Sequence, residues 1–288
     1  MNTPLDEVYD RLWLRVKDRN YKYYEQYPGD IQIVKRIVQH LSSQDDSNPI
    51  KLPSGGVLTA RRFLQLGLAL GGSPGSSFAN LHAIINSAFL DDDELSTAFL
   101  KRIDYEQSFD DAPLYFLLHE SIYADGPGPT NWAAHSSYER YVSTNPEFDY
   151  KITSKSDTED MVLFFGEMVF PWMADDYSEL SGYGMKSLSQ SIATKSDWLP
   201  LFDASNMRAA LGESNKGMAK SKAASATYYS DMYVDFDCAM KLIKKGEPLE
   251  NVKVWITNEY QHSGLRDDGA NVLTKLVQMA KGTINVPS

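Results

Sequence analysis

The run VKVWIT, residues 252–257, carries a compact strand pattern in this chain of 288 residues. Its β-branched residues and its tryptophan favour a strand, and KAASATYYSDMYV, residues 222–234, predicts a second strand-type run. Between the two we expect a helix over about 235–246, and after them a last helix over about 267–281. A strand, a helix, a strand and a helix in this order form the unit of a parallel sheet with crossover helices. The pattern therefore predicts an α/β fold.

Apolar residues recur at helical spacing through the first 123 residues, before any convincing strand. Helices are predicted over 3–27, 30–41 and 59–70, with further helical stretches near 78–90, 94–106 and 113–123. Two strands do not by themselves make a stable parallel sheet with both faces covered. Either further strands lie in the middle of the chain, or the sheet is incomplete.

The composition is that of a globular protein, with 42% hydrophobic and 23% charged residues. A net charge of −11 argues against nucleic acid and against anionic membranes as partners. The single cysteine, Cys238, rules out an internal disulfide and fits a reducing compartment. The early charges of Asp6 and Glu7 do not fit a signal peptide, and no apolar run reaches the ~18 residues of a membrane helix. We therefore expect a cytoplasmic protein.

An acid and a histidine follow the two predicted strands, where catalytic groups collect in parallel sheets. Asp231 comes after the first strand-type run, and His262 comes after the second, 31 residues later. A carboxylate that accepts a hydrogen bond from one ring nitrogen leaves the other free to act as a general base. This spacing alone also fits an ordinary loop or core histidine.

Seven sequence blocks, which run nearly from one end of the chain to the other, carry a family resemblance. They are RNYKYYEQYPGD (19–30), LPSGGVLTARRFLQLGLALGG (52–72), SFDDAPLYFLLHESIY (108–123), NWAA (131–134), GEMVFPWM (166–173), YYSDMYVDFD (228–237) and VWITNEYQHSGLRDDGANVL (254–273). Through them the chain resembles the proline iminopeptidases, or prolyl aminopeptidases, in the larger microbial and fungal branch of these serine peptidases. The resemblance implies an α/β-hydrolase fold and release of N-terminal proline from peptides, without a metal or an organic cofactor.

The resemblance also implies the roles of the acid and the histidine. Asp231 is expected to be the acid of the catalytic triad, and His262 is expected to be its base. Asp235 and Asp237 are close competitors for the acid. Asp231 is preferred because it comes first after the strand, where the family places its acid.

The nucleophile elbow of this fold, Gly-x-Ser-x-Gly between a strand and a helix, has one literal match, residues 71–75 (GGSPG). We expect Ser73 not to be the nucleophile, because Pro74 has no N–H for the oxyanion and the preceding run is helical. The resemblance implies that the chain begins just after the elbow. It is thus expected to be an incomplete α/β-hydrolase without its nucleophile, with a mainly helical cap domain over 1–215 and core strands and helices over 216–288.

An aminopeptidase must hold the free amine of its substrate, here a peptide with a free N-terminal proline. The resemblance implies cap glutamates for this task, and a lone glutamate among apolar residues is costly unless it meets a cation. Glu167 is the first candidate and Glu120 the second, although each could instead pair with a structural partner. Tyr123, Trp132, Phe170 and Trp172 are candidate walls for the pyrrolidine ring, or else ordinary core.

Two other kinds of protein remain open on the sequence. One is a non-catalytic, cap-like binding or vestigial fragment, which would fold but would not hydrolyse prolyl amides. The other is an α/β-hydrolase of different specificity, such as an esterase or an epoxide hydrolase. Such an enzyme would need no free amine, so the cap glutamates argue against it. The histidines lack metal-ligand spacing, and no metal site is expected.

Overall fold

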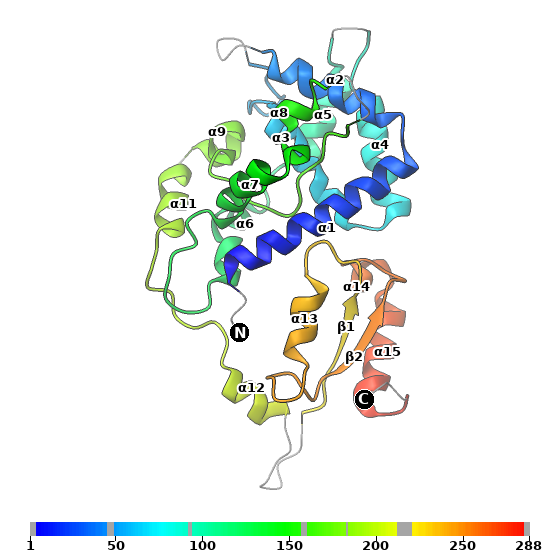
Figure 1. The fold of residues 1–288 in the computed structure, drawn as a ribbon, viewed down its shortest axis with the longest axis vertical. Coiled ribbons are helices and arrows are strands. Elements are labelled where there is room, and N and C mark those ends of the chain that lie inside the picture. The colour runs from blue at the N-terminus through cyan, green and yellow to red at the C-terminus, as the bar shows by residue number, and fades with distance from the viewer. Residues whose placement is uncertain are drawn as a thin grey trace.

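The computed structural model describes residues 4–44, 49–91, 94–156, 160–182, 184–211 and 221–284. Figure 1 shows a helical body that contains α1 (Leu5–Gln26) and a smaller part below it that contains the two strands. Within the body, α1 lies on the side that faces the strand-containing part.

The helical body holds the described helices from α1 to α11. Its other helices are α2 Asp30–Ser42, α3 Ala60–Leu64, η1 Gln65–Gly71, η2 Pro74–Phe78, α4 Ala79–Asn86, α5 Thr97–Glu106, α6 Pro113–Leu118, η3 Glu120–Tyr123, α7 Ala133–Thr144, η4 Pro146–Phe148, α8 Tyr150–Thr153, α9 Met173–Asp176, α10 Ser178–Ser181 and α11 Met185–Ala193. α12 (Ala204–Leu211) buries none of its residues and lies below the body in Figure 1, next to the strand-containing part. The six helical stretches predicted before residue 123 are confirmed. The helices over 133–211 were not predicted, because most are short and their apolar spacing is irregular.

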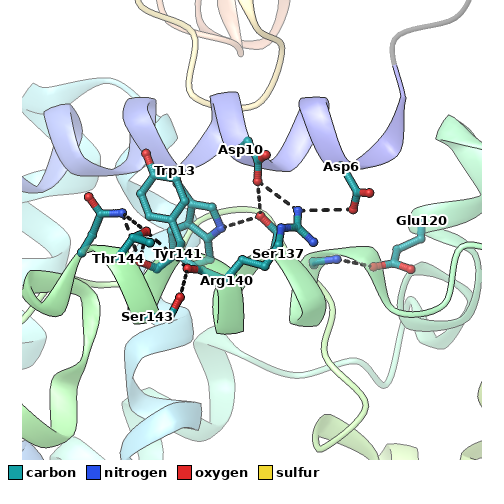
Figure 2. A network of polar contacts seen from close by, with 11 residues as sticks. Asp6, Asp10, Trp13, Glu120, Ser137, Arg140, Tyr141, Ser143 and Thr144 are labelled. Carbon is teal, nitrogen blue, oxygen red and sulfur yellow. Dashed lines mark hydrogen bonds and ion pairs between the residues drawn. The ribbon is translucent and has the colours of Figure 1, made fainter.

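α1 is held against the body by its buried aromatic face. Trp13 is fully buried, and its ring packs edge-on against Phe148 and Phe165. Its Nε1 donates a hydrogen bond of 3.1 Å to Ser137 Oγ on α7, and Ser137 donates in turn to Asp10 of α1. Figure 2 shows this network, which ties α1 to α7 through both apolar packing and paired polar groups.

The smaller part confirms the predicted order of strand, helix, strand and helix. Strands β1 (Ala224–Tyr228) and β2 (Lys253–Thr257) pair in parallel, with Ala224 opposite Lys253 and Tyr228 opposite Thr257. α13 (Phe236–Leu242) connects the strands, and α14 (Gly264–Asp267) and α15 (Gly269–Lys281) follow β2. α13 and α15 flank the sheet in Figure 1.

Further strands in the middle of the chain were one of two expectations, and within the described ranges they are not found. Between α1 and α12 the only strand-type pairs in those ranges are single bridges, Lys51 with Val57 and Phe89 with Leu95. The expected domain boundary, between residues 215 and 216, lies outside the described residues. In the part of the chain that is described, no helix is both long enough and apolar enough to cross a membrane.

Candidate active site

The parallel pairing of β1 and β2 brings their two following loops together. The strands end in register at Tyr228 and Thr257, and the Tyr229 N–H extends the pairing with a 3.1 Å hydrogen bond to the Thr257 carbonyl. Asp231 follows three residues after the end of β1, and His262 follows five residues after the end of β2. Both residues therefore lie at the carboxyl edge of the sheet, as predicted.

The Asp231 carboxylate is buried and fully engaged. Its side chain is only 5% exposed, and its Oδ1 accepts the backbone N–H groups of Tyr233 and Val234 at 2.8 and 3.1 Å. Its Oδ2 lies 3.0 Å from Nδ1 of His262. Because the turn after β1 donates two N–H groups to one oxygen, the other oxygen is fixed in direction toward the histidine ring.

The other two acids considered for this position lie elsewhere. Asp235 caps the N-terminus of α13 and faces Arg11 and Arg15 of α1, at 3.5 and 3.6 Å. Asp237 is exposed and pairs with Arg11. Among the described acids, Asp231 alone forms an ion pair with His262.

His262 is poised for proton transfer. The hydrogen bond from Nδ1 to Asp231 raises the pKa of the His262 imidazole, which partial burial lowers to a smaller extent. The side chain is 44% exposed and borders a cavity. No serine or cysteine within the described ranges forms a hydrogen bond with the ring. The Asp231–His262 pair therefore has the arrangement of a general base with its orienting acid.

The cavity next to His262 has a volume of about 530 Å³ and lies between the helical body and the loop after β2. Glu167 and Tyr115 of the body border it, opposite His262 and Tyr233. The other residues that line it include Leu66, Leu68, Phe109, Met168, Met173, Tyr177 and Arg266. Two carboxylates (Glu106 and Glu167), a histidine, an arginine and apolar side chains thus border one space, which is large enough for an amino-acid residue.

Glu167 is a carboxylate without a cationic partner. Tyr115 donates a hydrogen bond of 3.2 Å to its Oε1, and no lysine, arginine or histidine of the described residues forms an ion pair with it. Burial raises the pKa of Glu167, while the Tyr115 hydroxyl and the nearby His262 act in the opposite direction. A partly buried carboxylate in this state gains stability from a cation that enters the cavity.

Glu120, the second predicted amine-binding residue, has a structural partner. Its two carboxylate oxygens accept the backbone N–H groups of Ala133 and Ala134 at 3.1 and 2.9 Å, at the N-terminus of α7. Figure 2 shows the Glu120 carboxylate beside this end of the helix. It does not border the cavity that Glu167 and His262 share. The structure gives Glu120 a helix-capping role in place of the predicted contact with a substrate amine.

The four predicted aromatic walls, Tyr123, Trp132, Phe170 and Trp172, also lie outside this cavity. Phe170 is fully buried and stacks on Trp172, with ring centres 5.1 Å apart. The guanidinium of Arg61 lies over the Trp172 ring. Trp132 has a left-handed backbone, with φ 55°, and its Nε1 donates to Gln190. The rings that do line the cavity are Phe109, Tyr115, Tyr177 and Tyr233. They come from three separate segments, of which one holds both Phe109 and Tyr115, so sequence spacing could not group all four.

Ser73 occupies the N-cap position of a helical turn, and its side chain makes no capping hydrogen bond. It precedes the π-helical turn η2, and its Oγ donates a hydrogen bond of 3.1 Å to Asp267. The segment before Ser73 is the 3₁₀-helix η1, which confirms the helical run that the sequence predicted there. In the described ranges, no group of three or more histidine, cysteine, aspartate or glutamate side chains is arranged to hold a metal ion.

Two curated proteins match nearly the whole chain. A proline iminopeptidase of Aeromonas sobria is 34% identical over 274 residues, which is 95% of this chain and 57% of that protein. Proline iminopeptidase aneH of Aspergillus aculeatus is 27% identical over 281 residues, which is 97% of this chain and 56% of that protein. No protein-family model matches the chain. The chain spans a little over half the length of these relatives. Over nearly all of its own length, the chain is thus a homologue of proteins named proline iminopeptidase.

Proposed function

We propose that this chain supplies the acid–base pair and the amine-binding cavity of a prolyl aminopeptidase, an α/β-hydrolase that releases N-terminal proline from peptides. One observation carries the proposal: the His262 ring, held by Asp231 at 3.0 Å, and the unpaired carboxylate of Glu167 border the same cavity. A proton acceptor and a cation site on one small cavity suit a substrate whose scissile bond is one residue from a free amine. The two similar proteins are named for this activity.

In the proposed reaction, His262 takes the proton of a serine hydroxyl as that oxygen attacks the prolyl carbonyl. Asp231 keeps the proton of neutral His262 on Nδ1, so that Nε2 is the acceptor, and it stabilises the imidazolium that forms. His262 then donates this proton to the departing amine, and water releases proline from the acyl-enzyme in a second step. The serine of this mechanism is not among the residues that the structure describes.

Glu167 supplies the selectivity for a free N-terminus. The proline nitrogen is a secondary ammonium ion at neutral pH, and it can donate charge-assisted hydrogen bonds to a carboxylate. The Tyr115 hydroxyl holds the carboxylate from one side and leaves the cavity side for the substrate. The phenol and thioether groups around Glu167 exclude water and suit the apolar pyrrolidine ring.

The helical elements up to α12 act, in this proposal, as the cap that holds the substrate. Residues 216–288 then belong to the catalytic core. The binding partner of the protein is its substrate, a peptide with a free N-terminal proline. The proposed location is the cytoplasm, which the single cysteine favours.

The test is hydrolysis of L-proline 4-nitroanilide by the protein purified from its own cells, with its intact mass measured on the same sample. We expect turnover of this substrate and none of the N-acetylated form, because acetylation removes the charge that Glu167 binds. His262→Gln should abolish turnover. Equal hydrolysis of both substrates, or of simple esters only, would support a hydrolase of another specificity. A folded protein with an intact mass well above the 32.4 kDa of this chain that hydrolyses none of them would contradict the proposal.

A further inference from the structure

Tyr233 connects the acid–base pair to the helical body. It follows Asp231 by two residues, and its ring meets the His262 ring edge-on, with centres 4.8 Å apart and planes at 89°. Its hydroxyl donates a hydrogen bond to the carbonyl of Leu68 in η1. Its backbone N–H is one of the two donors to Asp231 Oδ1. One residue thus contacts the acid, the base and the wall of the cavity.

The body provides a fitted seat for this ring. A Cβ atom at Gly71 would lie 2.1 Å from Cζ of Tyr233, so the absence of a side chain at Gly71 is what admits the phenol. The buried Arg19 of α1 fixes the same segment: its guanidinium donates to the carbonyls of Leu70 and Gly72 at 2.6 and 2.7 Å. The acceptor for the Tyr233 hydroxyl is therefore part of a rigid segment, which α1 holds at two points.

We infer that Tyr233 is a positioning residue, which docks on η1 of the helical body and thereby fixes the His262 ring at the mouth of the cavity. The inference rests on the proposed function, since positioning matters for a base that must meet a substrate held by Glu167. His262 itself is 44% exposed, and its one polar restraint among the described residues is the bond to Asp231. A single hydrogen bond permits the ring to swing about its Nδ1, and the edge-on contact with Tyr233 removes that freedom.

Three substitutions separate the contributions of the ring and the hydroxyl. Tyr233→Phe keeps the ring against His262 and removes the bond to Leu68. Tyr233→Leu removes both. Gly71→Ala leaves Tyr233 in the sequence and closes its seat. Tyr229→Leu is the matched control, because Tyr229 lies in the same turn, is 53% exposed and packs on Phe236 and not on His262.

The first measurement does not depend on activity: the pKa of the His262 imidazole by NMR, with its resonance identified by its loss in His262→Gln. The chain has 5 histidines, so the spectrum is tractable. We expect the pKa to move toward the ordinary value of about 6.5 in Tyr233→Leu and Gly71→Ala, and to stay near the wild-type value in Tyr229→Leu. An unchanged pKa in Gly71→Ala and in a folded Tyr233→Leu would overturn the inference.

The second measurement is steady-state hydrolysis of L-proline 4-nitroanilide. We expect kcat to fall on the order of 10²-fold in Tyr233→Leu, with KM changed little, and Tyr233→Phe to retain most of kcat. A rise in KM with kcat unchanged would contradict the positioning role. If Tyr233→Leu does not fold, Gly71→Ala and Tyr233→Phe decide by the same two measurements. If the wild type lacks peptidase activity but the His262 pKa shifts as expected, the positioning role holds and the proposed function fails.

Discussion

Asp231 Oδ2 and His262 Nδ1 lie 3.0 Å apart, although 31 residues separate them in the chain. The parallel register of β1 and β2 creates this contact, because it ends both strands at one edge of the sheet. The two residues depend on each other chemically: the carboxylate favours the imidazolium, and the ring fills the one direction left open on the carboxylate.

The rate of the proposed reaction should follow the ionisation of His262, because only the neutral ring accepts a proton. Asp231 raises the pKa of His262, so the rate should fall as the pH drops through that raised value. In Asp231→Asn this pKa falls, the acidic limb of the profile moves to lower pH, and kcat drops by roughly 10⁴-fold, as in serine protease triads. Asp237→Asn, at an exposed acid on α13, should leave the profile unchanged. A normal pH profile in Asp231→Asn would exclude Asp231 as the triad acid.

The same pair should stabilise the fold on the acidic side. Since the folded pKa of His262 is above its unfolded value, the ion pair is fully present below pH of about 6.5 and is lost as the pH rises through the folded pKa. We expect His262→Gln to cost a few tenths of a kcal/mol at pH 5.5, since a ring exposed this much is well screened. At pH 9 it should cost less. Urea unfolding at both pH values measures the difference, and an equal cost at both would contradict the linkage.

Glu167→Gln should weaken substrate binding and stabilise the protein. Loss of one charge-assisted hydrogen bond raises KM for L-proline 4-nitroanilide by roughly 10- to 100-fold. Burial raises the pKa of Glu167, so its ionised form destabilises the fold increasingly as the pH rises above the unfolded value. Thermal unfolding at pH 8 should therefore show a gain of about 1 kcal/mol in the variant, and near pH 4 no gain.

A matched control for Glu167→Gln is Glu106→Gln. Glu106 also borders the cavity, but Asn80 donates to it at 3.2 Å and Arg102 lies 3.9 Å away. Glu106 therefore already has partners. Glu106→Gln should neither raise KM nor stabilise the protein, in contrast to Glu167→Gln. Equal effects of the two substitutions would mean that the cavity responds to net charge and not to a specific carboxylate.

Glu120→Ala should affect stability and leave KM unchanged. The substitution strips the acceptor from the N–H groups of Ala133 and Ala134 at the start of α7, which we expect to cost about 2 kcal/mol in denaturant unfolding. Because Glu120 is outside the cavity, KM for proline substrates should stay within about twofold. A tenfold rise in KM with normal stability would return Glu120 to the substrate site.

Ser73→Ala should retain full activity. Ser73 donates to Asp267 on α14 and has no hydrogen bond to His262, so its hydroxyl is not placed to attack a substrate. Steady-state hydrolysis of L-proline 4-nitroanilide by the variant is the check, with labelling by a serine-reactive organophosphate as a second readout. A total loss of both would make Ser73 the nucleophile.

Local pattern was enough to predict the long elements. α1, α2 and α15 carry regular apolar stripes, β2 carries a β-branched run, and β1 is rich in Ala, Thr and Tyr, so each could be predicted from a short window. The short helices over 133–211 were not visible, because they depend on packing around Phe164, Phe165 and Phe170 more than on their own periodicity. Phe170 is fully buried in this core and Trp172, which is partly buried, packs against it, so neither lines the cavity.

The sequence by itself determined the strand–helix–strand–helix order, the placement of Asp231 and His262 after consecutive strands and the resemblance that assigned them roles. These are local properties, set by side-chain type and spacing along the chain. Only the tertiary structure decided which glutamate faces the cavity and which rings line it. Glu120 and Glu167 are both acids among apolar neighbours in sequence. Only the fold places the N-terminus of α7 against Glu120, and His262 on the cavity that Glu167 borders. A side chain's partner depends on segments that meet in space, and no short window of sequence contains them.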